Sequence, residues 1–110
     1  MIELIVFEFL KKQLNVPVKM ERPEKEPEEY VLIEKIGSSS ENYIMSATIA
    51  IQSYATTMFG AAKLNEEVKK AMNGLSALND ISRTQLNTDY NYTDQSKKKY
   101  RYQAIYDLFY

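Results

Sequence analysis

The sequence predicts an α+β domain, in which a largely antiparallel sheet of four to five strands carries two helices on one face. Three observations lead to this fold class. Two segments space their apolar residues as helices do, a long central segment alternates as a strand, and the C-terminal part reads as a β-hairpin. The 110 residues fit a single domain, 1–110, that is large enough to bury a core without disulfides.

Residues 2–14 are expected to form the first helix. Their apolar side chains recur at helical spacing, at Ile2, Ile5, Val6, Phe9, Leu10 and Leu14. Glu3 near the start and Lys11 and Lys12 near the end match the helix dipole. Isoleucine, valine and phenylalanine favour strands equally, so a strand remains the alternative.

A short extended piece and an acidic loop follow. Pro17 lacks an amide donor, so the piece at 16–20 should lie at a sheet edge or start a strand. Residues 21–29 hold five glutamates, two prolines and no apolar residue, which predicts a solvated, mobile loop. Alternatively, the loop is an arm that orders on a partner. The candidate contact residues of that arm are Glu24, Glu26, Glu28 and Glu29.

The middle of the chain predicts two strands joined by a turn. Residues 30–36 alternate, with Val31 and Ile33 on one face. A turn or loop is expected at 37–42, which is rich in glycine and serine. The spacing there does not fit a phosphate-binding loop, which needs a second glycine followed by Lys and Ser or Thr. The segment 43–54 is apolar on both faces, so it should be a central strand.

The second half predicts a helix and a hairpin. The helix should start at Thr56 or Thr57, either of which can cap it, and stop at Asn73-Gly74. Ala61, Leu64, Val68, Met72 and Leu75 are expected on its buried face. Strands at 85–92 and 99–110 should pair antiparallel around a loop at 93–96, which would set their tyrosines on a shared face.

The composition leaves little room for catalysis. The chain has no histidine and no cysteine, so thiol nucleophiles, disulfides, histidine-paired nucleophiles and ordinary zinc sites are excluded. Glu28-Glu29 and Glu66-Glu67 are adjacent carboxylate pairs, but both are expected to be exposed, where a carboxylic acid is a poor proton donor at neutral pH. We therefore predict no catalytic residue, no metal and no cofactor, and a protein that is not an enzyme.

Charge and hydropathy suggest neither a nucleic-acid surface nor a membrane segment. The net charge is −1, so no broad basic face is expected. The stretch 97–102 mixes lysines, Arg101 and tyrosines, as single-strand binders do. Alternation, however, sends Lys99 and Arg101 to the face opposite the tyrosines. The N-terminus carries Glu3 and Glu8 and lacks a basic start, so we do not interpret it as a signal peptide.

Tyrosine is unusually frequent near the C-terminus. Six of the nine tyrosines lie after residue 89. They could pack on a strand face, or they could contact another subunit, because exposed tyrosine is enriched at protein interfaces. The candidate subunit-interface residues are Tyr90, Tyr92, Tyr100, Tyr102 and Arg101.

Four short strings make the sequence similar to a known family. They are ATIAIQSYA at 47–55, AAKLN at 61–65, DYNYTD at 89–94 and YRYQAIYD at 100–107. In these strings and in element order, residues 30–110 resemble tail terminators and related tail-completion (head–tail joining) proteins. Such proteins are encoded by long-tailed phages and prophages of Gram-positive bacteria.

The resemblance implies a structural subunit that forms a ring, usually a hexamer, which terminates the tail tube and joins it to the head connector. The implied partners are other copies of the chain, the major tail tube protein and head–tail connector proteins. No membrane or small-molecule substrate is implied, and nucleic acid would only pass through the channel. The implied location is the tail or neck of the virion, after assembly in the host cytoplasm. Two alternatives remain, a head-side connector or closure subunit and a small regulatory protein-binding module.

Overall fold

The structure is a computed structural model that describes residues 1–41, 44–78 and 81–110. It confirms the predicted α+β class, with a mostly antiparallel sheet and two helices packed on it. The elements in chain order are α1 (Ile2–Gln13), β1 (Val18–Lys19), β2 (Tyr30–Glu41), β3 (Ile44–Ala55), α2 (Met58–Met72), the short 3-10 helix η1 (Leu75–Ala77), β4 (Arg83–Asn91) and β5 (Tyr100–Phe109).

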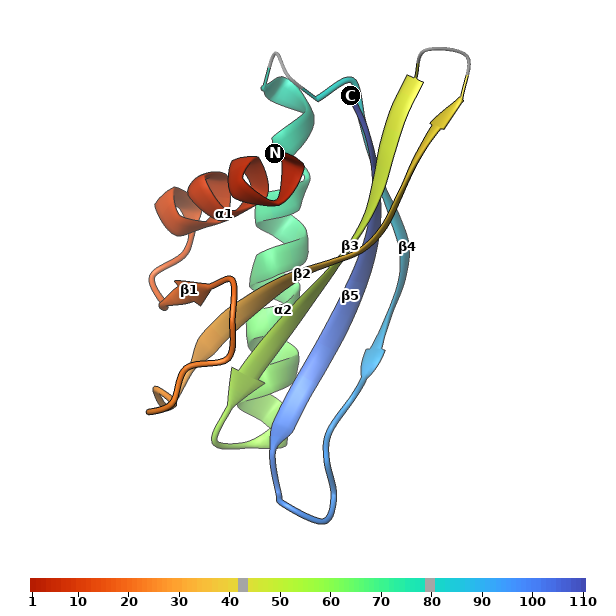
Figure 1. Cartoon of the computed structure of the whole chain (residues 1–110). Helices are drawn as coiled ribbons and strands as arrows, with labels where there is room; N and C mark the ends of the chain where they lie inside the picture. The colour runs from red at the N-terminus through yellow and green to blue at the C-terminus, as the bar shows by residue number, and fades with distance from the viewer. Residues whose placement is uncertain (42–43, 79–80) are drawn as a thin grey trace.

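The five strands form one sheet in the order β1-β2-β3-β5-β4 (Figure 1). Only β1 and β2 run parallel, and the other neighbours are antiparallel. The predicted central strand is confirmed, because β3 lies between β2 and β5. The predicted C-terminal hairpin is also confirmed, as β4 pairs with β5, and β4 forms an outer edge of the sheet.

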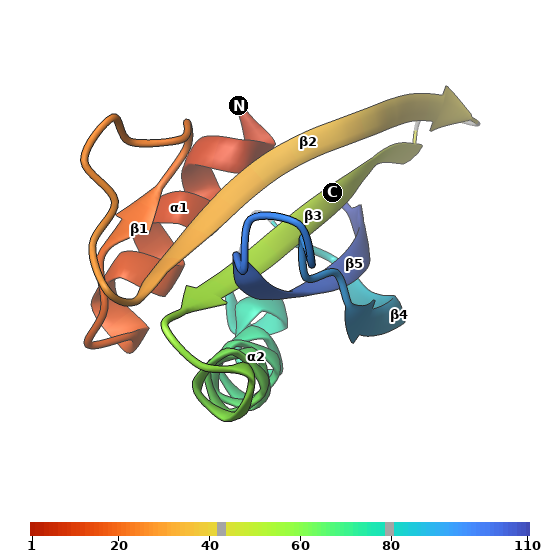
Figure 2. The ribbon, with the colours of Figure 1, turned by 90° about the horizontal axis from the view of Figure 1, so that it is seen from below.

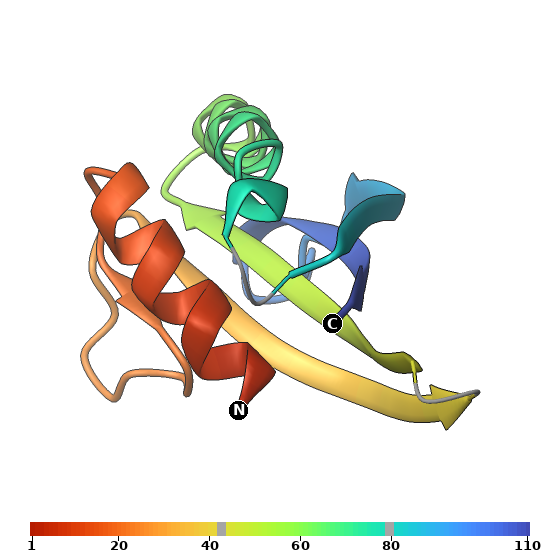
Figure 3. The same cartoon turned by 90° about the horizontal axis from the view of Figure 1, so that it is seen from above.

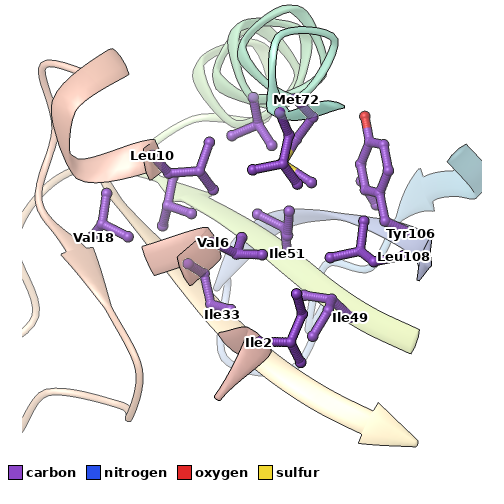
Figure 4. Packing of buried hydrophobic residues seen from close by; sticks show 14 of the residues in the cluster. Ile2, Val6, Leu10, Val18, Ile33, Ile49, Ile51, Met72, Tyr106 and Leu108 are labelled. Carbon is purple, nitrogen blue, oxygen red and sulfur yellow. The ribbon is translucent and has the colours of Figure 1, made fainter. Parts of the chain in front are cut away.

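Both helices pack their apolar faces against the sheet. In Figure 3, α1 lies beside β2. The second helix, α2, is viewed nearly end-on and lies beside β3. Ile2, Val6 and Leu10 of α1 are at most 3% exposed, at spacings of four residues. They meet Ile33 and Ile49 of the sheet in one continuous core (Figure 4). This periodic burial decides between the two alternatives for residues 2–14 in favour of the helix.

The second helix begins and ends close to the predicted residues. The Thr57 hydroxyl accepts a hydrogen bond from the Gly60 amide at 2.9 Å, which satisfies one of the free amides of the first turn. A Cβ at Gly60 would lie 3.0 Å from that hydroxyl and 3.1 Å from Ala55 Cβ, so glycine leaves room for the cap. The helix ends at Met72, and Leu75 reaches the core from η1 instead.

The turn predicted at 37–42 is wrong for the residues that the structure describes there. Gly37 to Glu41 continue β2, which pairs with β3 as far as Glu41–Ile44, with a β-bulge at Ile36. Residues 42–43 lie outside the described residues. The long ladder to β3, together with the Ser39–Ser46 hydroxyl contact of 2.6 Å, outweighs the weak strand propensity of glycine and serine.

The result is a projecting arm, made of residues 36–41 and 44–46. Figure 2 shows this end of the β2–β3 hairpin reaching beyond both helices. The molecule is accordingly elongated, with extents of 44 × 26 × 24 Å. Three apolar side chains of the arm, Ile36, Ile44 and Met45, are 43–54% exposed.

Candidate functional site

The face of the sheet opposite the helices carries a connected set of polar and aromatic side chains, here called the tyrosine network. Its members come from β2, β3, β4, β5, the loop before β2 and the residue directly after β4. They are Glu26, Tyr30, Gln52, Tyr54, Tyr90, Tyr92, Arg101 and Gln103.

Two stacked tyrosines form one end of the tyrosine network. The rings of Tyr30 and Tyr54 lie 4.5 Å apart and 4° from parallel. The Tyr30 hydroxyl donates to Glu26 at 2.6 Å, and Arg101 donates to the Tyr54 hydroxyl at 2.9 Å. Burial, and then the neighbouring Tyr54, raise the pKa of Tyr30. This end is therefore fixed by both packing and hydrogen bonds.

A glutamine pair links the centre of the sheet to its β4 edge. Gln52 donates to the side-chain oxygen of Gln103 at 2.7 Å, and both residues are at most 8% exposed. Gln103 in turn donates to the Tyr90 hydroxyl. Arg101 lies 4.4 Å from the ring centre of Tyr92 and donates to its carbonyl at 2.7 Å. Tyr90 and Tyr92 are each at least 40% exposed, so their outer surfaces remain available.

The predicted shared face for the tyrosines of β4 and β5 is wrong. Tyr90 lies opposite Gln103, and Asn91 lies opposite Tyr102. From Thr88 to Asn91, even-numbered residues of one strand therefore meet odd-numbered residues of the other, because the connecting loop sets the register there. Tyr90 and Tyr92 share a face with Arg101, whereas Tyr100 and Tyr102 fall on the helix side with Ala104 and Tyr106. The candidate interface residues are thus divided between the two faces.

Glu26 fixes the acidic loop 21–29 to the rest of the domain. Its carboxylate accepts from Tyr30 and forms ion pairs with Arg22, at 3.3 Å, and with Lys99 of the β4–β5 connection. Glu26 is therefore held within the chain. Glu24, Glu28 and Glu29 are exposed and stay candidates for contact with a partner.

We expect Glu26→Ala to loosen the loop 21–29 more than it destabilises the domain. The change removes one hydrogen bond and two partly exposed ion pairs, which together contribute about 1–2 kcal/mol. Hydrogen exchange at residues 21–29 should accelerate about tenfold, while exchange in β3 stays close to that of the wild type. Glu28→Ala, a change at an exposed residue of the same loop, is the matched control. Equal protection in the two variants would contradict the role of Glu26.

On the helix side, Asp89 of β4 joins the hairpin to α2. Its carboxylate accepts from Asn65 at 2.8 Å and from Lys69 at 3.0 Å. The hydrogen bond to Asp89 raises the pKa of Lys69. Tyr106 lies nearby at 3% exposure, and burial raises its pKa to about 12.

Tyr106 and Lys69 predict a loss of stability at alkaline pH. Both pKa values are raised by folding, so the stabilisation is complete below about pH 10 and falls as pH rises through the folded pKa values. For Tyr106 the loss reaches about 2–3 kcal/mol. Urea unfolding between about pH 9 and 12 should show a shallower decline in Tyr106→Phe. Tyr92→Phe leaves Tyr106 in place and should decline like the wild type. An unchanged decline in Tyr106→Phe would contradict the assignment.

Two long stretches of sheet edge are unpaired among residues 1–41, 44–78 and 81–110. One is the outer side of β4. The other is the outer side of β2 beyond Leu32, because β1 pairs only with Val31 and Leu32. Proteins usually shorten, charge or cover such edges, since they pair readily with other chains. On β4, however, seven of the nine residues are neutral and none is proline.

The described residues show no centre for metal chemistry and no membrane span. No group of three or more Asp or Glu in this part of the chain could hold a metal ion. Within the same residues, no helix is long and apolar enough to cross a membrane. Comparison with protein-family models gives no match, and comparison with curated proteins gives no significant relative.

Proposed function

We propose that this chain is a structural subunit that assembles with copies of itself into a ring, and that the ring terminates a phage tail tube and joins it to the head connector. The observation that carries the proposal is the pair of unpaired sheet edges, one on each side of the same sheet. A subunit with different complementary surfaces on its two sides associates head to tail, and such association closes into rings when the rotation allows. The resemblance of residues 30–110 to tail-completion proteins supports the biological setting.

The tyrosine network supports the same proposal. It presents exposed, immobilised aromatic rings, such as Tyr92 beneath Arg101, next to the β4 edge. Rigid tyrosine and arginine side chains favour protein contacts because little conformational entropy is lost when they are buried. Tail tube and connector proteins are the partners that the resemblance implies for the surfaces of such a ring.

The test is to combine the purified protein with tail tubes and to examine the tubes by electron microscopy. We expect a ring at the head-proximal end of each tube, and tails of uncontrolled length or without heads when the gene is deleted. Association with filled heads and not with tubes would favour the head-side connector or closure subunit instead. A stoichiometric host protein recovered from extract, with normal tails after deletion, would favour a regulatory module.

A further inference from the structure

We propose that the outer edge of β4 pairs antiparallel with the free part of β2 in a second copy of the chain, with Arg83 opposite Glu41 and Asp89 opposite Lys35. This inference deepens the proposed function and rests on its claim that copies of the chain associate. Four features of the two edges support it, namely their lengths, directions, backbone orientation and charges.

The two edges have the same length. β4 has nine residues, Arg83–Asn91. On β2, which has twelve residues, β1 pairs with Val31 and Leu32, so the last nine, 33–41, are free. In the proposed register the end of β4 at Asn91 meets Ile33, immediately beyond the two β2 positions that β1 occupies. The second copy therefore extends the edge where β1 stops.

The two edges also have the required directions. Three successive antiparallel pairings, β2–β3, β3–β5 and β5–β4, make β4 antiparallel to β2 within one sheet. If the next copy continues the sheet with its helices on the same side, β4 meets the neighbouring β2 in antiparallel orientation. Antiparallel pairs are the slightly more stable kind.

On β2, the backbone groups that point outward can be identified from hydrogen bonds already made. The Val31 amide donates outward to the Pro17 carbonyl at 2.9 Å, so Ile33 and Lys35 also direct their groups outward. The β-bulge at Ile36 then shifts the alternation by one residue.

Beyond the bulge, the backbone orientation of β2 residues 37–41 follows from their pairing with β3. Met45 exchanges two hydrogen bonds with Tyr110, on the β5 side of β3. Its partner Ser40 on β2 therefore directs its own groups to the outer edge, as does Ser38. The free edge of β2 thus presents Ile33, Lys35, Ser38 and Ser40.

Hydrogen bonding to the neighbouring strand β5 also shows which groups of β4 point outward near its C-terminal end, from Asp89 to Asn91. The Tyr92 amide donates to the Arg101 carbonyl on β5 at 2.9 Å, so Asn91 and Asp89 point outward. A register shift between Leu86 and Thr88 then changes the alternation.

For the N-terminal part of β4, residues 83–86, the hydrogen bonds of Tyr110 show which backbone groups point outward. Tyr110 bonds to β3, so the preceding residue, Phe109, and its partner Arg83 direct their groups toward each other. Thr84 and Leu86 then point outward. The proposed register matches each outward residue of β4 with one of β2. The hydrogen-bonded pairs are Asn91–Ile33, Asp89–Lys35, Leu86–Ser38 and Thr84–Ser40.

Charges and faces agree with this register as well. Lys35 and Asp89 both lie on the helix side of the sheet, and Glu41 and Arg83 both lie on the opposite side. Each pair joins opposite charges across the interface. The β-bulge of β2 at Ile36 and the register shift of β4 between Leu86 and Thr88 lie at the same level of the interface. Side chains on the same face of the sheet therefore lie opposite each other on both sides of these irregularities. A slip by one residue would place every side chain opposite the wrong face.

Charge reversal at the exposed end of the interface tests the register. Glu41→Arg and Arg83→Glu should each weaken self-association at low salt about tenfold, because like charges then lie directly opposite. Mixing the two variants should restore association, since in alternating order every interface again joins opposite charges. Glu67→Arg, a reversal at an exposed position of α2, is the control and should associate like the wild type. Circular dichroism checks that each variant is folded.

The outcomes separate this inference from the proposed function. If the wild type forms rings on tail tubes, and both folded reversals do so equally well, edge pairing in this register is wrong and the tail role stands. If mixing does not restore association between two folded, weakened variants, the pairing of residues 41 and 83 is also wrong. If the reversals behave as expected but the protein never joins tail tubes, the pairing stands and the tail role fails.

Discussion

Leu10→Ala should destabilise the domain by about 2–5 kcal/mol. Leu10 is fully buried on α1 and lies in the continuous core with Val18 and Ile33. Truncating it removes apolar contacts and leaves a cavity that the packed helix and sheet fill only in part. Leu4→Ala is the matched control. It changes the same residue type on the same helix, at a position that is 42% exposed, and should cost below about 1 kcal/mol.

Urea unfolding at neutral pH measures both variants. A similar small loss in the two leucine variants would mean that α1 is not part of the cooperative core. A loosely packed α1 would also leave the edge of β2 less well supported, because α1 packs on β2. In addition, Glu3 of α1 lies 3.6 Å from Lys35 of β2 in an ion pair. The free edge of β2 and its charge are therefore supported by α1.

Gln52→Met should cost about 1–3 kcal/mol, and Gln52→Met combined with Gln103→Met should cost less than the sum of the two single changes. In the single variant the buried side-chain oxygen of Gln103 loses the hydrogen bond from Gln52. A buried polar group without its partner destabilises the folded state. When both glutamines become apolar, neither amide is left without its partner. The coupling energy should be about 0.5–2 kcal/mol.

A double-mutant cycle from urea unfolding at neutral pH gives this coupling directly. The exposed neighbour Thr88→Met is the control partner for Gln52→Met, and the effects of that pair should add. Additive effects of Gln52→Met and Gln103→Met would show that the glutamine contact does not hold β3 and β5 together.

Periodicity was sufficient to predict most of the fold. Leu10 and Val68 recur at helical spacing with their apolar neighbours and are buried where that spacing places them. Thr57 and Asn73 carry local capping chemistry, so the ends of α2 were predictable to within a residue. The extended conformation of β2 residues 37–41 was not predictable in this way. Pairing with β3, and not the local content of glycine and serine, decides whether these residues are extended.

The candidate site was predicted less completely. Tyr90, Tyr92 and Arg101 were candidates because tyrosine is frequent near the C-terminus and enriched at interfaces, and these three residues lie together. Register, which local sequence does not determine, sends Tyr100 and Tyr102 to the other face. Gln52 and Gln103 were missed. The available signal was a long polar residue in the middle of each of two apolar strands, which requires a partner once buried.

Cross-linking between copies tests most directly whether the chain assembles through its two sheet edges. The chain has no cysteine, so a pair introduced by Glu41→Cys and Arg83→Cys is the sole source of disulfides. In the proposed register this pair is a non-hydrogen-bonded pair next to the hydrogen-bonded pair Thr84–Ser40, and opposite Cβ atoms of such a pair are close enough to be bridged. After mild oxidation, the account predicts a ladder of multiples of 12.8 kDa that stops at one ring size and collapses on reduction. Glu41→Cys with Thr84→Cys, on opposite faces, should remain largely unlinked. A folded 41/83 variant that stays at 12.8 kDa, or a 41/84 control that links equally well, would contradict the account.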